Sequence, residues 1–299
     1  MSGIPVLFVQ EQGLAAAWEH SILALRQDGC EIRTEYDAKD SEGHYLNPPS
    51  KDSTMLVTVL DPASEPFYHR AFPGGLADLQ EYSMEVLDGI KDHWMYQPDP
   101  TGTKWKYTYH DRLTKYNARV PGCDYAAPSG PPGDYNQIED MVQKLAKSPH
   151  SRRAQAITWK VWEDTTLSDP PCLQSIWCRV YVDADGVWWL CMNVRFRSRD
   201  AYDAAFMNMV ALIALMERIA KRIGDVAGCV VRLGRYCDMS DSYHIYGTRL
   251  QHCEDGFMKL LRTRTFEDRT WTREFAEPIM QEAIPLIRAK VAAHDAEHA

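Results

Sequence analysis

The chain has 299 residues, with 33 lysine and arginine against 42 aspartate and glutamate side chains, and therefore a net charge of −9 at pH 7. Its 45% hydrophobic and 25% charged residues are typical of a folded globular protein and exclude an intrinsically disordered chain. The negative charge excludes a general nucleic-acid coat, because neutralising phosphates needs a basic surface. We therefore expect no DNA partner, although a few arginines could still hold a small anion.

The N-terminal segment does not have the pattern of a secretion signal, because it lacks a basic start and its apolar stretch contains Pro5. The longest apolar run, near residues 206–216, ends at Glu217, short of the roughly 20 residues that a membrane helix needs. The eight cysteines show no CxxC pair or zinc-like spacing, which favours free thiols in a reducing compartment. We expect a cytoplasmic protein without a membrane segment or a metal.

Hydrophobic periodicity predicts a helix-rich first half. Helices are expected over residues 14–26, 76–94 and 135–147, a buried strand over 55–60, and loops over 37–53, 96–102 and 121–135. The first helix is expected to end at the Asp28-Gly29 pair, because glycine commonly terminates helices.

The second half is more regular and mixes strands with long helices. Strands are expected over residues 154–162, 175–183, 186–195, 229–233 and 244–248, a core helix over 202–223, and a closing helix over 278–293. Pro278 suits the first turn of the closing helix. Strands separated by a long apolar helix indicate a mixed α+β fold, and no composition break divides residues 1–299 into two domains.

One constellation of residues points to chemistry. Cys172 follows two prolines ahead of a predicted strand, and five arginines lie in the same region of the sequence, at positions 152, 153, 195, 197 and 199. Guanidinium groups favour the thiolate form of cysteine, and forked arginines suit a phosphate monoester. Spacing alone also fits a core thiol with solvated arginines, so both interpretations stay open.

Five short motifs in order and register add a resemblance. They are Ser151-Arg152-Arg153-Ala154, Asp169-Pro170-Pro171-Cys172, Arg197-Ser198-Arg199-Asp200, Phe206-Met207-Asn208 and Asp241-Ser242-Tyr243-His244-Ile245-Tyr246. Over residues 148–251 they resemble the thymidylate synthase family, which includes the pyrimidine hydroxymethylases. The first half is similar more loosely, through Glu85 and residues 107–112, and looks like a divergent, archaeal- or phage-like branch.

The resemblance implies a thymidylate synthase-like α+β fold, with a mixed β-sheet at a homodimer interface and a long buried central helix. It implies that Cys172 is the nucleophile that adds to C6 of the pyrimidine. Arg197 would hold the phosphate and favour the thiolate. Arg152 and Arg153 would reach the phosphate in the partner's site, as a symmetric dimer allows.

The resemblance also assigns the contacts to base and sugar. Asn208 would read the base, since a carboxamide can donate to O4 and accept from N3–H of uracil, whereas cytosine-specific members tend to carry aspartate there. His244 and Tyr246 would hold the sugar 3′-hydroxyl. Ser198 would contact the deoxyribose or the phosphate.

A last group of implied residues serves the one-carbon donor and the protons. Asp200 would bind the pterin ring of 5,10-methylenetetrahydrofolate. Glu85 would order the water network that moves protons at O4 and C5. Tyr109 would assist proton removal from C5.

The chain departs from the family pattern in three places. The flexible phosphate-binding arginine near the N-terminus has only Lys51 as a candidate, which supplies charge but no bidentate fork. A Leu-Gly-x-Pro segment on the folate wall is replaced around residues 203–205. The last residues, 295–299, lack the apolar end that closes over the folate.

The implied reaction transfers a one-carbon unit to C5 of dUMP and gives dTMP and dihydrofolate. If water enters the closed site, the product is 5-hydroxymethyl-dUMP with tetrahydrofolate, and two of the departures favour that entry. A third alternative is hydroxymethylation of dCMP or CMP, which Asn208 disfavours. A non-catalytic nucleotide- or RNA-binding member would be expected to lose Cys172 or the arginines, which this chain retains.

Overall fold

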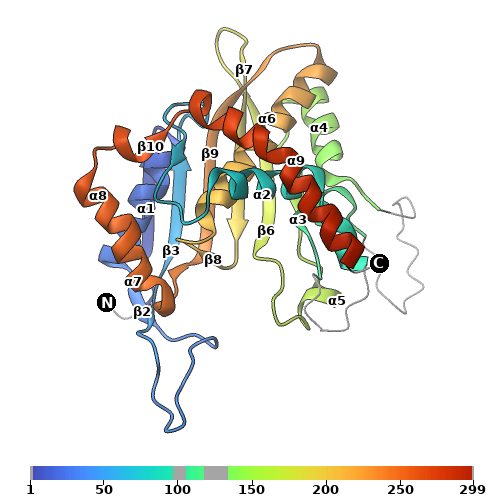
Figure 1. Cartoon of the computed structure of the whole chain (residues 1–299). Coiled ribbons are helices and arrows are strands. Elements are labelled where there is room, and N and C mark those ends of the chain that lie inside the picture. Colours follow the sequence, from blue (N-terminus) through green and yellow to red (C-terminus); the bar gives the residue numbers. More distant parts are fainter. Residues whose placement is uncertain (1–2, 97–105, 118–133, 298–299) are drawn as a thin grey trace. The chain divides into compact units, whose positions relative to one another are not determined.

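The computed structural model describes residues 3–96, 106–117 and 134–297 (Figure 1). The chain forms two compact units, each assembled from three stretches of sequence. Unit 1 comprises Met1–Leu79, Arg195–Val210 and Arg235–Glu282, and unit 2 comprises Gln80–Val194, Ala211–Gly234 and Ala283–Ala299. The single domain over residues 1–299 stays a prediction.

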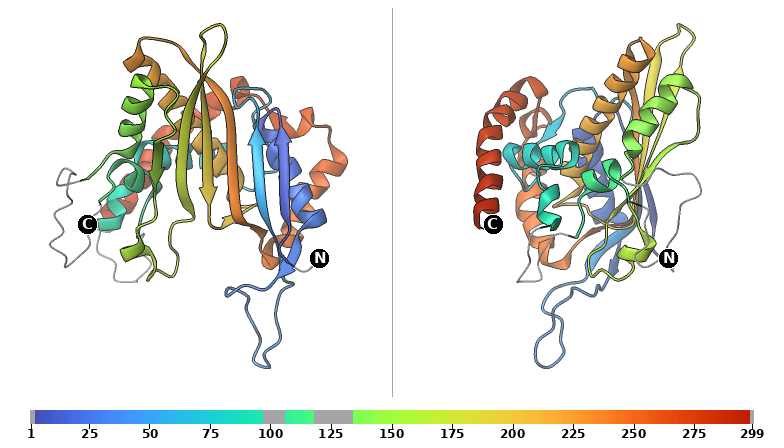
Figure 2. Two further views of the ribbon diagram at one scale, coloured as in Figure 1. Left: turned by 180° about the vertical axis from the view of Figure 1, so that it is seen from behind. Right: turned by 90° about the vertical axis from the view of Figure 1, so that its right-hand side faces the viewer.

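Unit 1 contains a mixed sheet. Its strands are β1 (Val6–Glu11), β2 (Cys30–Ile32), β3 (Ser50–Val59), β8 (Arg199–Asp200) and, from Arg235 onward, β9 (Val231–Ile245). β3 runs parallel to β1 and antiparallel to β2 and β9, while β8 runs parallel to β9. The loop of residues 33–49, between β2 and β3, projects away from this sheet in all views (Figure 2).

The helix α1 (Leu14–Asp28) covers β1 and β3 because its apolar residues recur on one side. Leu14, Trp18, Ile22 and Leu25 have no exposed area. The Trp18 ring lies 5.0 Å from the Phe206 ring and 5.2 Å from the Phe257 ring, centroid to centroid. Aromatic packing around Trp18 is therefore the centre of this unit's core.

The C-terminal part of unit 1 is a run of short helices and a two-stranded ribbon. Its elements are η2 (Gly247–Arg249), α7 (Leu250–Cys253), the π-helix η3 (Glu254–Met258), α8 (Lys259–Thr263), η4 (Glu267–Arg269) and β10 (Thr270–Trp271), which pairs with β4 (Tyr68–His69). A buried carboxylate ties this part to α1. Although burial opposes it, hydrogen bonds from Arg269 and His69 lower the pKa of Glu19 to about 2.

Unit 2 contains the strands β5 (Ala154–Ile157), β6 (Leu173–Val182) and β7 (Trp188–Phe196) up to Val194. β5 and β6 are antiparallel, and β7 follows β6 through a tight turn. Asp183 Oδ1 accepts hydrogen bonds from the backbone N–H groups of Asp185 and Val187, and Gly186 adopts a φ of 79°. The turn therefore has the left-handed glycine that a tight hairpin requires.

Helices also contribute to unit 2, and several of them contribute residues to both units. The helices are α2 (Leu76–Asp88), η1 (Asp92–Tyr96), α3 (Tyr109–Thr114), α4 (Gln137–Lys147), α5 (Val161–Asp164), α6 (Ala205–Ala227) and α9 (Arg273–Glu297). α4 packs on β5 and α3. Along α6, Phe206, Met209, Ile213, Met216 and Ile219 have no exposed area, which confirms the long buried helix and the α+β class.

Five element predictions need correction. The loop predicted over 37–53 ends earlier, because β3 begins at Ser50, ahead of the strand predicted over 55–60. The two strands predicted over 229–233 and 244–248 belong to one strand, β9, which ends at Ile245. The strand predicted over 154–162 ends at Ile157, because α5 follows. α2 ends at Asp88, ahead of Gly89 with a φ of 62°. Pro278 lies inside α9 rather than in its first turn. Residues 97–102 and 121–133 of the predicted loops lie outside the described residues.

Candidate active site

The twelve residues predicted for the site divide between the two units. Unit 2 carries Glu85, Tyr109, Arg152, Arg153 and Cys172, and unit 1 carries Lys51, Arg197, Ser198, Asp200, Asn208, His244 and Tyr246. Within residues 3–96, 106–117 and 134–297, no group of three His, Cys, Asp or Glu side chains could hold a metal ion.

Cys172 and Tyr109 lie next to each other in unit 2 although 63 positions separate them in the sequence. Cys172 is a half-buried free thiol directly before β6, and Tyr109 is the first residue of α3. The backbone N–H of Leu173 donates to the Tyr109 hydroxyl over 3.1 Å. The structure therefore brings the phenol to the residue that follows the predicted nucleophile.

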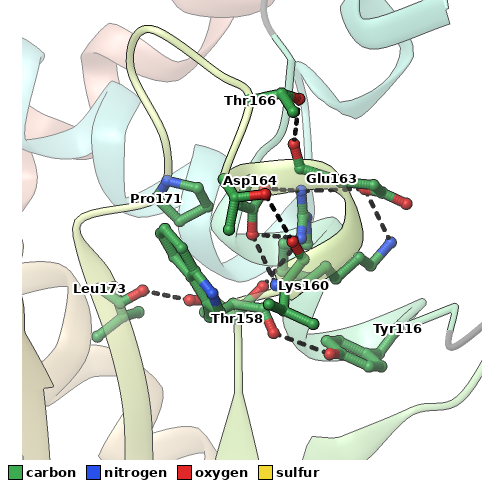
Figure 3. A network of polar contacts seen from close by, with 12 residues as sticks. Tyr116, Thr158, Lys160, Glu163, Asp164, Thr166, Pro171 and Leu173 are labelled. Atoms are coloured by element: carbon green, nitrogen blue, oxygen red, sulfur yellow. Dashed lines mark hydrogen bonds and ion pairs between the residues drawn. The ribbon is translucent and has the colours of Figure 1, made fainter.

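A buried polar network fixes the segment around Cys172 (Figure 3). Arg112 donates to both carboxylate oxygens of Asp164, at 3.1 and 2.8 Å, and Asp164 has no exposed area. Arg112 also donates to the Thr158 carbonyl, and the Thr158 hydroxyl donates to the Leu173 carbonyl. Because a fully satisfied buried network is rigid, it positions the backbone on which the thiol is carried.

Glu85 lies in a buried carboxylate–lysine cluster on and after α2. Its side chain is 14% exposed, and Lys91 Nζ lies 3.2 Å from Glu85 Oε2 and 2.7 Å from Glu81 Oε1. Burial raises the pKa of Glu85, and the Lys91 charge opposes that rise without cancelling it. A raised pKa makes a carboxyl group a better proton acceptor than an ordinary glutamate, which suits it to accept and return protons. Sequence reasoning missed Lys91.

Arg152 and Arg153 precede β5 and are exposed, with their backbone carbonyls held by Trp177 and Lys144. Neither guanidinium makes a hydrogen bond or ion pair with any residue that the structure describes. Both side chains therefore point to solvent from unit 2, and they do not contribute to its fold by charge pairing.

The arginines between β7 and β9 in unit 1 have different environments. Arg199 is buried with Nη1 2.9 Å from Asp238 Oδ1, and Arg195 pairs with Asp241 at 3.1 Å. These two arginines therefore have carboxylate partners, which weakens the interpretation of the whole cluster as a phosphate site. Arg197 and Ser198 lie between them and are half-buried.

His244 is buried at the end of β9 and packs on Tyr246, with the two ring centroids 4.6 Å apart. Its Nδ1 lies 3.1 Å from Ser242 Oγ, while its Nε2 is buried and meets no hydrogen-bond partner in the described parts of the chain. Burial lowers the pKa of His244 to about 4, so the imidazole is neutral at pH 7. A buried nitrogen without a partner is costly unless a ligand supplies one.

Asp200 and Asn208 flank the start of α6 in unit 1. Asp200 Oδ1 accepts hydrogen bonds from the backbone N–H groups of Tyr202 and Asp203. Burial raises the pKa of Asp200 to about 6. Asn208 is 7% exposed in the first turn of α6.

Lys51 lies on β3, with Nζ 3.4 Å from the Gly29 carbonyl and 3.5 Å from Glu31 Oε1. In this arrangement the Lys51 ammonium group lies against Gly29 and the β2 residue Glu31. A phosphate would have to compete with the Glu31 carboxylate for the ammonium group.

A family comparison identifies the chain. The thymidylate synthase family model matches residues 75–268, which is more than half of the sequence. The chain belongs to the thymidylate synthase family. It is therefore a folate-dependent pyrimidine C5 transferase by family, as the motifs predicted.

The similar proteins among curated sequences fit the predicted divergent branch of this family. A protein of Methanocaldococcus jannaschii named "Putative thymidylate synthase" is 28% identical over 249 residues, which cover 82% of this chain and 92% of the relative. A relative of the same name from Methanothermobacter thermautotrophicus is 26% identical, with 83% and 96% covered. Thermostable thymidylate synthase A of Bacillus subtilis matches in structure, with a TM-score of 0.52, 17% identity and 83% and 84% coverage, and it supports the fold.

The C-terminal segment that departs from the family pattern is helical in its described part, since α9 continues to Glu297. No helix among the described residues is long and apolar enough to cross a membrane. The homodimer, its interface and the cytoplasmic location remain predictions from the sequence.

Proposed function

We propose that this protein transfers the one-carbon unit of 5,10-methylenetetrahydrofolate to C5 of dUMP and gives dTMP and dihydrofolate. The observation that carries the proposal is the 3.1 Å hydrogen bond between Tyr109 and Leu173, beside Cys172. Nucleophilic addition at C6 and proton removal at the neighbouring C5 need a thiol and a proton acceptor close together. The contact of Tyr109 with the residue after Cys172 supports this arrangement.

Each step that the protein performs has a candidate residue. Cys172 Sγ forms a bond to C6, and the displaced electron pair makes C5 nucleophilic. Arg197 binds the phosphate and favours the thiolate. Glu85, with its raised pKa, orders water at O4 and C5, and Tyr109 assists as the C5 proton leaves. The folate supplies the one-carbon unit and, for methylation, the hydride.

Substrate recognition is assigned in the same way. Asn208 donates to O4 and accepts from N3–H of uracil, and His244 with Tyr246 binds the sugar 3′-hydroxyl. Ser198 contacts deoxyribose or phosphate. Arg152 and Arg153, exposed and without charge partners among the described residues, reach the phosphate in the second subunit of a homodimer. Lys51 adds charge at the phosphate once it leaves Glu31.

A second candidate product rests on a specific ion pair. Arg249 makes two hydrogen bonds to Asp203, at 2.6 and 2.7 Å, in the segment that replaces the family's Leu-Gly-x-Pro. A charged pair on the folate wall attracts water, and water in the closed site would give 5-hydroxymethyl-dUMP and tetrahydrofolate.

Mass spectrometry of the nucleotide product separates the two candidates. With dUMP and 5,10-methylenetetrahydrofolate we expect a methylated nucleotide and an equal amount of dihydrofolate, followed by its absorbance. A hydroxymethylated nucleotide without dihydrofolate would contradict methylation and leave the residue roles intact up to the last step. Absence of any product with dUMP, dCMP and CMP would contradict the proposed activity.

Asp200 gives a pH prediction for folate binding. The carboxyl group accepts from pterin N–H groups only when ionised, and its pKa of about 6 means that it protonates as the pH falls through that value. The KM for the folate is therefore expected to rise below about pH 6 and to be constant above about pH 7. Steady-state kinetics at saturating dUMP measure it.

The Asp200→Asn variant is expected to have a raised KM for the folate that no longer changes between about pH 5 and pH 8. Asp185→Asn, at the exposed β6–β7 turn, is the matched control and should keep the wild-type profile. A wild-type KM that is constant over this range would contradict the role of Asp200.

A further inference from the structure

Three side chains of unit 1 form a chain of hydrogen bonds that ends at His244. Asp52 lies on β3 and is directly opposite His244 on β9. The Ser242 hydroxyl donates to Asp52 Oδ2 over 2.7 Å, and Ser242 Oγ lies 3.1 Å from His244 Nδ1. Asp52 is 8% exposed and His244 4%. The contact with Asp52 does not follow from the family motif, because Asp52 lies outside it.

The order of donors along this chain decides which imidazole nitrogen carries hydrogen. The Ser242 hydroxyl has one hydrogen and directs it to the Asp52 carboxylate, so Ser242 Oγ accepts from His244 Nδ1–H. A neutral imidazole has a single N–H, so Nε2 presents a lone pair. This Nε2, like Asp52 Oδ1, is buried and has no hydrogen-bond partner among the described residues.

We propose that Asp52 is a positioning residue which, through Ser242, holds His244 in the tautomer whose Nε2 accepts a hydrogen bond from a substrate hydroxyl. The proposal deepens the proposed function and rests on its assignment of His244 to the sugar. It adds a dependence: the preference for a nucleotide with a 3′-hydroxyl, which that assignment already implies, requires Asp52.

The Asp52 carboxylate has features that fit this role. Burial raises the pKa of Asp52, and the Ser242 hydrogen bond opposes that rise by favouring the ionised form. Were Asp52 protonated, it would donate to Ser242 and Ser242 would donate to Nδ1, which would place the hydrogen on Nε2. The two arrangements predict opposite tautomers, so the proposal is decided by a measurement on the free protein.

The first experiment is nitrogen NMR of the ¹⁵N-histidine-labelled full chain at neutral pH without nucleotide. Protonated and bare imidazole nitrogens have well-separated ¹⁵N shifts, and a His244→Gln variant assigns the signals. We expect Nδ1 protonated and Nε2 bare in the wild type. In Asp52→Ala the Ser242 hydroxyl is released to donate to Nδ1, so the other tautomer is expected to appear.

The second experiment measures the dissociation constants of dUMP and of its 3′-deoxy analogue by calorimetry. The wild type is expected to bind dUMP roughly tenfold more tightly than the analogue, which is the contribution of one hydrogen bond. Asp52→Ala is expected to bind both about equally. Ser242→Thr keeps the hydroxyl and should retain the wild-type discrimination, while circular dichroism checks that each variant is folded.

A hydrogen on Nε2 in the wild type, or an unchanged tautomer in Asp52→Ala, would overturn the proposal. Unchanged discrimination in a folded Asp52→Ala variant would overturn it as well. The tautomer is measured without substrate and so does not depend on the proposed activity. If His244 is protonated on Nδ1 but the product assay fails, the result contradicts the proposed function and not the hydrogen-bond chain.

Discussion

The Cys172→Ser variant is expected to lose at least about 10⁴-fold in kcat while it still binds dUMP, because a neutral hydroxyl cannot replace a thiolate as the nucleophile at C6. Single-turnover kinetics with product detection measure the first quantity, and calorimetric titration with dUMP measures the second. A covalent adduct with a 5-fluorinated dUMP, visible as a mass shift of the wild-type protein, is expected to be absent in the variant.

A matched control separates this loss from a general effect of removing a thiol. Cys229 is also half-buried and free, so Cys229→Ser changes the same atoms in a similar environment. Its turnover is expected to stay close to that of the wild type. Unchanged turnover in Cys172→Ser would overturn the whole mechanism, including the roles of Arg197 and Tyr109.

The Asn208→Asp variant is expected to reverse the base preference. A carboxylate cannot donate to O4 of uracil, whereas it can accept from the amino group of cytosine. The kcat/KM for dUMP is expected to fall about 10²-fold, equivalent to about 2.7 kcal/mol, and turnover of dCMP is expected to rise above the wild-type value. Competition between the two nucleotides in one reaction, with mass detection of both products, measures the ratio directly.

Asn136→Asp is the control for the amide-to-acid change. Asn136 is exposed and its side chain caps α4 by accepting from the Glu139 N–H, a role that aspartate fills equally well. It should leave both the stability and the base preference unchanged. An unchanged preference in Asn208→Asp would mean that another residue reads the base.

The sequence predicted those elements whose burial is periodic. α1 follows from Leu14, Trp18, Ile22 and Leu25, all without exposed area, and α6 follows from its apolar run. β3 was predicted only over its second half, because its first residues are polar. β9 was predicted only at its ends, because its centre carries charged side chains. Asp238 is buried against Arg199, and this ion pair holds polar residues inside a strand where hydrophobic periodicity gives no signal.

The candidate site likewise combines residues that the sequence pattern predicted with residues that it did not. The motif supplied Cys172 and His244, together with Ser242, but other contacts near them came from elsewhere in the sequence. Asp52 accepts a hydrogen bond from Ser242 over 190 positions, and Arg112 donates to Asp164 over 52 positions. Neither pairing has a local pattern, so only tertiary structure could reveal it. Lys91, by contrast, follows Glu85 by six residues and could have been suspected as a charge partner from proximity.

The pairing of β3 with β9 contains an irregularity that limits how the length of the chain can vary. Ser53 is opposite Tyr243 and Met55 is opposite Ser240, so two steps along β3 match three along β9. Side chains alternate between the two faces of a strand. Loss of the extra residue of β9 would therefore move the side chains on one side of the irregularity to the opposite face. A one-residue deletion in β9 at this point therefore has the same effect as replacing many side chains at once, His244 among them. A deletion in one of the two strands together with a matching change in the length of the other preserves the site.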